Sequence, residues 1–278
     1  MKLLSNCHTH SDFCDGKDSP YEIARYAVTL GMSDLGFSSH SYIPFDDECH
    51  GILNEAEYIS EIGRLKEIFS ENLYISCGIE LDSMSSSVSS MDKKYDYIIQ
   101  SVHYLCNSSG IPVSIDNTIG ELEGLIYERY DGKFDNLAED YFQAVLDSVI
   151  SSKADIVAHY DLITKFEKEC TLIDENSKRY RNAAIDVLDT IVDFISSYGG
   201  MFEVNTGAMA RGYKTNPYPS DFILKRLCER DARVIITSDS HSKENLLYGF
   251  DPAHDYLLNA GFKSMAVFKK GRFVEVSI

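Results

Sequence analysis

The sequence contains no long hydrophobic run. Its apolar stretches are all shorter than the roughly 20 residues that a membrane-spanning helix requires, so we expect no membrane segment. The first residues also lack the basic region, apolar core and cleavage site of a secretion signal. We therefore expect a cytoplasmic protein with no membrane partner.

Cysteine motifs are also absent. The seven cysteines are scattered, contain no CxxC pair and are never followed six positions later by arginine. These absences exclude a disulfide framework and a zinc ribbon, and they argue against the CxxxxxR loop of cysteine phosphatases. We expect most of the cysteines to be reduced packing residues.

Positive charge is scarce. The chain has 26 Lys and Arg residues against 44 Asp and Glu residues, which gives a net charge of −18. Nucleic-acid binding normally requires clustered cationic side chains, so we expect no nucleic-acid partner. Bound cations would offset part of this acidity, because carboxylate ligands count as charges until the metal is included.

The 278 residues fit one α/β domain spanning residues 1–278, and no stretch resembles an interdomain linker. Short β-branched or aromatic runs alternate with amphipathic stretches, which is the pattern of βα units around a parallel sheet. Strands are expected at residues 2–7, 33–38, 73–79, 96–102, 155–158, 201–204 and 233–237. Helices are expected from Ser19-Pro20 onward and at residues 56–69, 137–150, 179–197 and 219–229. Seven strand-helix units predict a barrel.

Three segments depart from this alternation. Residues 107–135 are irregular and are interpreted as an insertion that contains one helix. Residues 83–90 are rich in serine and are expected to form a loop. Residues 266–278 predict an edge hairpin that turns at Lys270-Gly271.

Two histidines stand where the first predicted strand ends, in Cys7-His8-Thr9-His10. In an extended strand residues i and i+2 project to the same side, so His8 and His10 are spaced to bind one metal ion. Residues that can bind metal follow other strands as well: His40, Glu80, His103, His159, Asp239 and His241. Because the C-terminal ends of parallel barrel strands open on one face, these side chains are expected to converge there.

Imidazole and carboxylate ligands without thiolates are typical of zinc, iron or manganese sites, and this chain has more of them than one ion requires. We therefore expect more than one metal, with Glu80 as a carboxylate that bridges two ions. Clustered cations lower the pKa of bound water and hold phosphoryl oxygens, so the predicted reaction is hydrolysis of a phosphate ester. His50 and His254 lie in a loop and at an expected helix start, where an ordinary packing or surface role is favoured.

Seven motifs occur in order along nearly the whole chain: HTH...DG (His8, His10, Asp15), FSSH (His40), GIELD (Glu80), SVHYL (His103), AHYDL (His159), FEVNTG (Glu203, Asn205) and SDSH (Asp239, His241). This set resembles the polymerase-and-histidinol-phosphatase (PHP) superfamily, and its closest likeness is to the PHP-type histidinol-phosphatases. The resemblance implies a distorted (β/α)7 barrel of the PHP type, with the active site at the C-terminal ends of the strands. It also implies three divalent ions, which would be zinc, manganese or iron.

The resemblance further implies which residues hold each ion. One metal would be bound by His8, His10, Glu80 and Asp239, and a second by Glu80, His103 and His159. The third would lie between Asp15, His40 and His241. Some relatives carry histidine where this chain has Asp15, so the identity and occupancy of the third metal stay open.

Arg211, eight residues after Glu203, is the candidate phosphate clamp, because a guanidinium can pair with phosphate through two parallel hydrogen bonds. Its alternative role is that of a solvated loop arginine. Lys165 and Asn205 are further candidate substrate-binding residues. Asp239 and His241 are the candidate catalytic residues for protonating the leaving alkoxide, His241 directly or Asp239 through a metal-bound water, and the sequence leaves the choice open.

The implied activity is hydrolysis of L-histidinol phosphate to L-histidinol and phosphate by a metal-dependent phosphomonoesterase of histidine biosynthesis. The amine and imidazole of this small substrate would be favoured by the acidic loop residues Asp46, Asp47, Glu48 and Asp116. Two alternatives are a PHP phosphoesterase acting on another small phosphate ester or nucleotide, and a non-catalytic metal-binding scaffold. The intact ligand set argues against a scaffold, and the sequence leaves open whether the chain forms a homo-oligomer.

Overall fold

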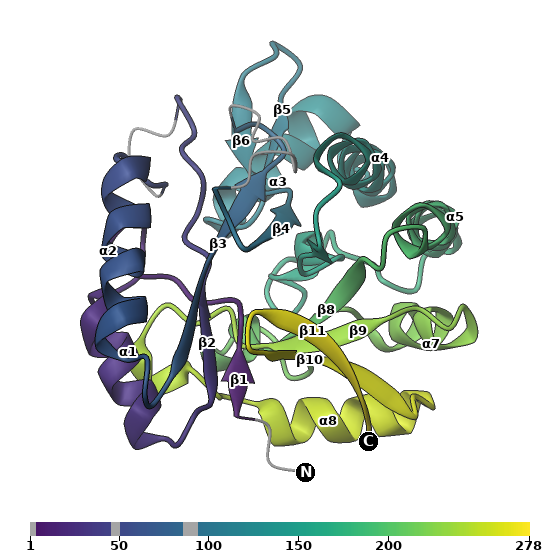
Figure 1. Ribbon diagram of the computed structural model, residues 1–278. Helices are drawn as coiled ribbons and strands as arrows, with labels where there is room; N and C mark the ends of the chain where they lie inside the picture. Colours follow the sequence, from purple (N-terminus) through teal and green to yellow (C-terminus); the bar gives the residue numbers. More distant parts are fainter. Residues whose placement is uncertain (1–3, 46–50, 86–93) are drawn as a thin grey trace.

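A computed structural model describes residues 4–45, 51–85 and 94–278. Its main sheet contains seven strands that pair side by side and run parallel (Figure 1). In sheet order these are β1 (Ser5–Asn6), β2 (Asp34–Phe37), β3 (Tyr74–Asp82), β4 (Tyr97–Ser101), β7 (Ile156–Val157), β8 (Met201–Asn205) and β9 (Val234–Thr237). The predicted α/β class and the seven predicted strands are confirmed, with boundaries that differ by a few residues.

The first and seventh parallel strands meet just beyond their C-terminal ends. Thr9 and Ser240 form an isolated parallel bridge. The His10 amide donates a hydrogen bond to the Ser240 carbonyl at 2.8 Å, and the Ser240 amide donates to the His8 carbonyl at 3.2 Å. These bonds close the sheet into a distorted barrel at the end where the predicted ligands lie.

The C-terminal hairpin extends the sheet beyond β9. Strand β10 (Ser264–Lys269) pairs parallel with β9 and antiparallel with β11 (Arg272–Ser277). Lys270 and Gly271 join the two strands with positive φ angles of 50° and 68°. Positive φ at both central residues is the requirement of a type I′ hairpin turn, so the predicted turn at this dipeptide is confirmed.

The helices lie around the outside of the strands (Figure 1). They are α1 (Pro20–Thr29), α2 (Glu55–Ile68), α4 (Phe134–Ser152), α5 (Lys178–Ser196), α7 (Asp221–Glu229) and α8 (Phe250–Ala260). The first begins as predicted: Ser19 caps it, and Glu22 completes a capping box with Ser19. Among the described residues, no helix is long and apolar enough to cross a lipid bilayer.

Tyr97, the first residue of β4, is buried against the ends of β1 and β2. Its hydroxyl donates hydrogen bonds to the carbonyls of Cys7, at 2.6 Å, and Phe37, at 3.1 Å. A Cβ atom at Gly36 or Gly78 would collide with this side chain, so glycine at both positions makes room for it. The tyrosine therefore ties the ends of β1 and β2 together beneath the site.

The predicted insertion contains more structure than expected. Its helix is present as α3 (Ile119–Tyr130), but an antiparallel hairpin of β5 (Tyr104–Cys106) and β6 (Pro112–Ser114) precedes it. This hairpin was not predicted, because strands of three residues are too short to show a clear alternating pattern. The single domain with an insertion stays a prediction. Part of the serine-rich loop, residues 86–90, lies outside the described residues.

Candidate metal centre

Glu80 lies at the centre of the predicted ligands, near the C-terminal end of β3, and is almost fully buried. Its Oε2 atom lies 3.0 to 3.4 Å from ring nitrogens of three histidines: His8, His10 and His40. Its Oε1 atom lies 3.2 Å from Nε2 of His159 and 3.6 Å from Nε2 of His103. The two oxygens of one carboxylate therefore face two separate sets of imidazoles.

Asp239 approaches the first set from β9. Its Oδ1 atom lies 3.1 Å from Nε2 of His10 and 3.6 Å from Nε2 of His8. The Asp239 backbone has a φ of 46°, in the left-handed region that aspartate tolerates better than most residues. Such conformations persist where the surrounding structure holds them, and here the unusual turn lies directly at the cluster.

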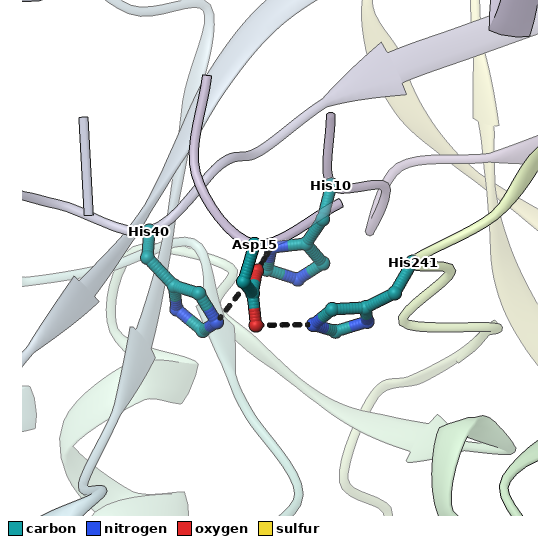
Figure 2. A group of neighbouring side chains, drawn as sticks. All are labelled: His10, Asp15, His40 and His241. Carbon is teal, nitrogen blue, oxygen red and sulfur yellow. Dashed lines mark ion pairs between the residues drawn. The ribbon is translucent and has the colours of Figure 1, made fainter. Parts of the chain in front are cut away.

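Asp15 forms a second carboxylate centre at the mouth of the cluster (Figure 2). Its oxygens lie 3.1 Å from Nε2 of His241 and 3.7 Å from ring nitrogens of both His10 and His40. The rings of His10 and His241 stack with centroids 4.1 Å apart. These four residues offer ligand atoms that all lie within 4.8 Å of one another.

All nine predicted ligands thus gather at one edge of the barrel. Three groups have ligand atoms close enough to share an ion: His8, His10 and Asp239; His40, Glu80 and His103; and His10, Asp15, His40 and His241. They overlap with the three sets implied by the family resemblance, but His10 and His40 each fall in two groups. The number of ions and the assignment of ligands to each ion stay predictions.

Burial and neighbouring charges shift the pKa values of this cluster. Burial and the neighbouring His241 and His40 lower the pKa of His10 to about 3, so its imidazole is neutral and able to bind a metal. Burial also disfavours the charged form of His8, but the carboxylates of Glu203 and Glu80 outweigh it and raise the pKa of His8. Nearby histidines outweigh burial at Glu80 and keep its pKa well below the usual range.

The donor set fits a divalent cation. Nδ1 of His8 lies 2.8 Å from a Glu203 oxygen, so the proton of a neutral His8 ring belongs on Nδ1. The lone pair on Nε2 then faces oxygens of Glu80 and Asp239, which also carry lone pairs. Nε2 of His10 is buried and has no hydrogen-bond partner. A cation between these atoms would satisfy all of them.

Two buried carboxylates at the site were not predicted to have a role of their own. Glu203 on β8 contacts His8, and Asp82 on β3 lies with Oδ2 3.3 Å from Nδ1 of His103 and 2.7 Å from its backbone amide. The available signal was a charged residue inside an otherwise apolar strand, in YISCGIELD and MFEVN. Such residues are almost never fully buried unless they are paired.

A cavity of about 630 Å³ opens beside the cluster. Its lining includes ligand residues such as His103 and His241, together with Tyr104 of β5 and Asp116 of the insertion. Arg211 lies on its edge with Nη2 3.2 Å from Oδ2 of Asp239, so the structure brings this predicted clamp to the ligands. Burial lowers the pKa of Arg211, but the Asp239 carboxylate outweighs this effect, so the pKa is raised and the guanidinium stays cationic.

The other two predicted substrate-binding residues have different positions. Lys165 lines the cavity, where its Nζ atom donates hydrogen bonds to the backbone carbonyl of Asp116 at 2.5 Å and to its carboxylate at 3.1 Å. Asn205 is fully buried, binds Glu203 at 2.7 Å and accepts from the Gly207 amide at 2.8 Å. The structure does not bring the Asn205 side chain to the lining of the cavity.

The remaining predictions concern residues away from the centre. Asp46, Asp47, Glu48 and His50 lie outside the described residues. His254 lies in α8, is partly buried and belongs to none of the three ligand groups among the described residues; its ordinary packing or surface role stays a prediction.

The chain is similar in sequence to a known protein family and to proteins of known name. The PHP domain family profile matches residues 6–207. A protein of Schizosaccharomyces pombe named "Probable histidinol-phosphatase" is 27% identical over 95% of this chain and 89% of its own length. The "Histidinol-phosphatase" of Bacillus subtilis is 23% identical over 88% of this chain and 96% of its own length.

A solved structure supports the same fold. The histidinol phosphate phosphatase of Lactococcus lactis, complexed with zinc, L-histidinol and phosphate, superposes with a TM-score of 0.70 at 20% identity. The match covers 98% of this chain and 99% of that protein. At this identity the likeness establishes the fold, which agrees with the barrel seen here.

Proposed function

Because this chain belongs to the PHP domain family, we propose that it is a metal-dependent phosphomonoesterase that hydrolyses L-histidinol phosphate to L-histidinol and phosphate. One observation carries the proposal. The two oxygens of Glu80 face separate sets of imidazoles, beside a cavity whose edge holds a cationic arginine. That arrangement suits a multinuclear phosphatase. The curated relatives named as histidinol-phosphatases, which match across most of this chain, support the choice of substrate.

The residues present would hold two or three divalent cations, with zinc supported by the Lactococcus lactis relative and manganese or iron as the alternatives. When bound, such cations supply an activated water and neutralise phosphoryl charge. The remaining ligands would divide as the family pattern implies: Asp239 with His8 and His10, and Asp15 with His40 and His241.

The protein's own side chains would bind and orient the ester. Arg211 would pair with phosphate oxygens, since its guanidinium lies at the edge between the ligands and the cavity. Lys165 would add positive charge at the lining of the same cavity, where Asp116 holds its ammonium group. The proton for the leaving alkoxide would come from His241, or from a bound water oriented by Asp239, whose Oδ1 atom lies 3.5 Å from Nδ1 of His241. We assign Asn205 to the support of Glu203 instead of to substrate.

The cavity supports a leaving group that is partly aromatic and partly cationic. Its lining combines apolar side chains, such as Ile43, Tyr104 and Val113, with carboxylates of Asp116 and Glu121. An imidazole would pack on the apolar side chains, and an ammonium would be favoured by the carboxylates. This combination favours L-histidinol phosphate over a nucleoside bisphosphate, whose second phosphate would meet that acidic lining.

One experiment separates this proposal from its alternatives. Phosphate release is measured with L-histidinol phosphate, a nucleoside bisphosphate, a plain alkyl phosphate and a short oligonucleotide, on protein of known metal content. We expect the highest kcat/KM for L-histidinol phosphate. A higher value for another ester would assign a different phosphatase specificity, and no release from any ester by metal-loaded protein would support a scaffold.

A further inference from the structure

Glu203 accepts four hydrogen bonds inside the barrel, and its carboxylate is almost fully buried. Oε1 accepts from the His159 amide at 2.6 Å and from the Asn205 side chain at 2.7 Å. Oε2 accepts from the Thr237 hydroxyl at 2.8 Å and lies 2.8 Å from Nδ1 of His8. One carboxylate thereby connects β8 with β9 and with the ends of β1 and β7.

The contact with His8 decides which nitrogen of that ring is free. A carboxylate can only accept, so Nδ1 of His8 must carry the proton that Glu203 receives. In a neutral ring the lone pair is then on Nε2, which points toward Glu80 and Asp239. Since a histidine binds metal through an unprotonated nitrogen, Glu203 selects the form of His8 that can act as a ligand.

We propose that Glu203 is a positioning residue: it is not itself a ligand, but it fixes the tautomer and orientation of His8 and anchors the backbone of His159. The proposal rests on metal binding at this site, which is part of the proposed function. It assigns a purpose to a charge that would otherwise be costly to bury in the barrel.

Glu203→Gln is a selective test, because an amide has one accepting oxygen and one donating nitrogen. The His159 amide and the Asn205 side-chain nitrogen can only donate, so they would take the amide oxygen. The amide nitrogen would then face His8 and Thr237, whose hydroxyl can accept instead of donate. His8 would have to accept on Nδ1, which moves its proton to Nε2 and blocks the ligand position.

Thr237→Val is the matched control, because it removes another hydrogen bond to the same Glu203 oxygen and leaves the His8 contact intact. Metal-free wild type, Glu203→Gln and Thr237→Val are titrated with zinc against a chromophoric chelator, and the thermal midpoint of each metal-free protein is recorded. We expect Glu203→Gln to weaken zinc binding by about 10- to 100-fold, the range for outer-shell partners of metal ligands. Thr237→Val should bind zinc like the wild type.

The outcomes are distinguishable. Equal zinc affinity in Glu203→Gln and wild type overturns the positioning role and leaves the proposed function intact. An equal loss of zinc affinity in Glu203→Gln and Thr237→Val leads to the same conclusion. A wild type that binds no zinc, manganese or iron overturns both. Should Glu203→Gln fail to fold, nitrogen NMR of zinc-loaded, 15N-histidine-labelled wild type still decides: a proton on Nδ1 of His8 is expected, and a proton on Nε2 contradicts the inference.

Discussion

Nε2 of His159 lies 3.2 Å from Oε1 of Glu80, on the opposite oxygen from the one that faces His8. The carboxylate therefore contacts a histidine that follows β1 through one oxygen and a histidine that follows β7 through the other. Burial raises the pKa of a carboxyl group, but here the neighbouring imidazoles outweigh it and keep Glu80 ionised. Loss of this single charge should consequently disturb two ligand sets at once.

Glu80→Gln should therefore lose more bound metal and more activity than His241→Ala, which removes one ligand from the exposed side of the cluster. The amide keeps the volume but lacks the charge and the second accepting oxygen. We expect kcat/KM to fall by more than about 100-fold, beyond the range seen for outer-shell partners. Metal analysis and steady-state kinetics on both variants check this, and near-normal turnover and metal content in Glu80→Gln would disprove the bridging assignment.

Metal removal should abolish phosphatase activity without unfolding the barrel. The bound cations supply both the activated water and the positive charge that phosphate requires. No other group in the described cluster can activate the water. Prolonged dialysis against a chelator, followed by addition of zinc, manganese or iron, should show activity returning in proportion to bound metal. Full activity in protein that elemental analysis finds metal-free would contradict the proposed chemistry.

Eight of the nine ligands were predictable from the sequence because each follows a predicted strand and the strand ends share one face. The ninth, Asp15, was predicted only through the family resemblance. The positions of the protons on the histidine rings were not predictable. Glu203 and His8 are 195 positions apart, and no local pattern indicates that a buried carboxylate will meet a particular ring nitrogen. The pairing of Lys165 with Asp116 was not predictable for the same reason, because it joins the insertion to the segment after β7. The strands of the β5-β6 hairpin are too short to show a periodic hydrophobic pattern, so they could not be predicted in this way.

A buried cluster away from the metal centre predicts how stability depends on pH. Burial and the neighbouring Glu167 carboxylate raise the pKa of Glu175 to about 7. Its unfolded value lies near 4.5, so the folded state binds the extra proton and loses stability as pH rises from about 4.5 through 7. The loss should stay below the roughly 3 kcal/mol that about 1.4 kcal/mol per pKa unit would give. This is because contacts with Glu175 and Lys214 outweigh burial and lower the pKa of the partner Glu167, which shifts stability in the opposite direction.

Glu175→Gln should remove this pH dependence. Above pH 7 the variant should be more stable than the wild type, and near pH 4.5 the difference should shrink, because both proteins are then uncharged at this position. Urea unfolding at a series of pH values measures the effect. Glu139→Gln, which alters an exposed salt bridge with Arg179, is the control and should change the free energy of unfolding by less than about 0.5 kcal/mol. Parallel pH profiles for wild type and Glu175→Gln would contradict the shifted pKa.

Nδ1 of His241 faces two groups, from Arg211 and Asp239, and it cannot form a hydrogen bond with both of them at once. The Nη1 atom of Arg211, a donor, lies 2.9 Å from Nδ1 of His241, while the Asp239 carbonyl, an acceptor, lies 3.0 Å from the same nitrogen. Nδ1 can accept from the arginine or donate to the carbonyl, but not both. When Nε2 of His241 binds a metal, the ring proton is on Nδ1, which donates a hydrogen bond to the Asp239 carbonyl. The guanidinium is then left with an unused donor beside the cavity, where a phosphate oxygen can accept.

Arg211→Ala should therefore lower kcat/KM for L-histidinol phosphate by roughly 2 to 5 kcal/mol, the range for truncating one partner of a desolvated charge pair. Inhibition by free phosphate should weaken in parallel, and metal content should stay unchanged. Arg211→Lys should recover only part of the loss, because an ammonium keeps the charge without the planar fork. Arg64→Ala, at an exposed position on α2, is the control and should stay within about 0.5 kcal/mol. If Arg211→Ala loses metal together with activity, the guanidinium holds Asp239 and not the substrate; if kinetics and phosphate inhibition are unchanged, Arg211 is an ordinary surface residue.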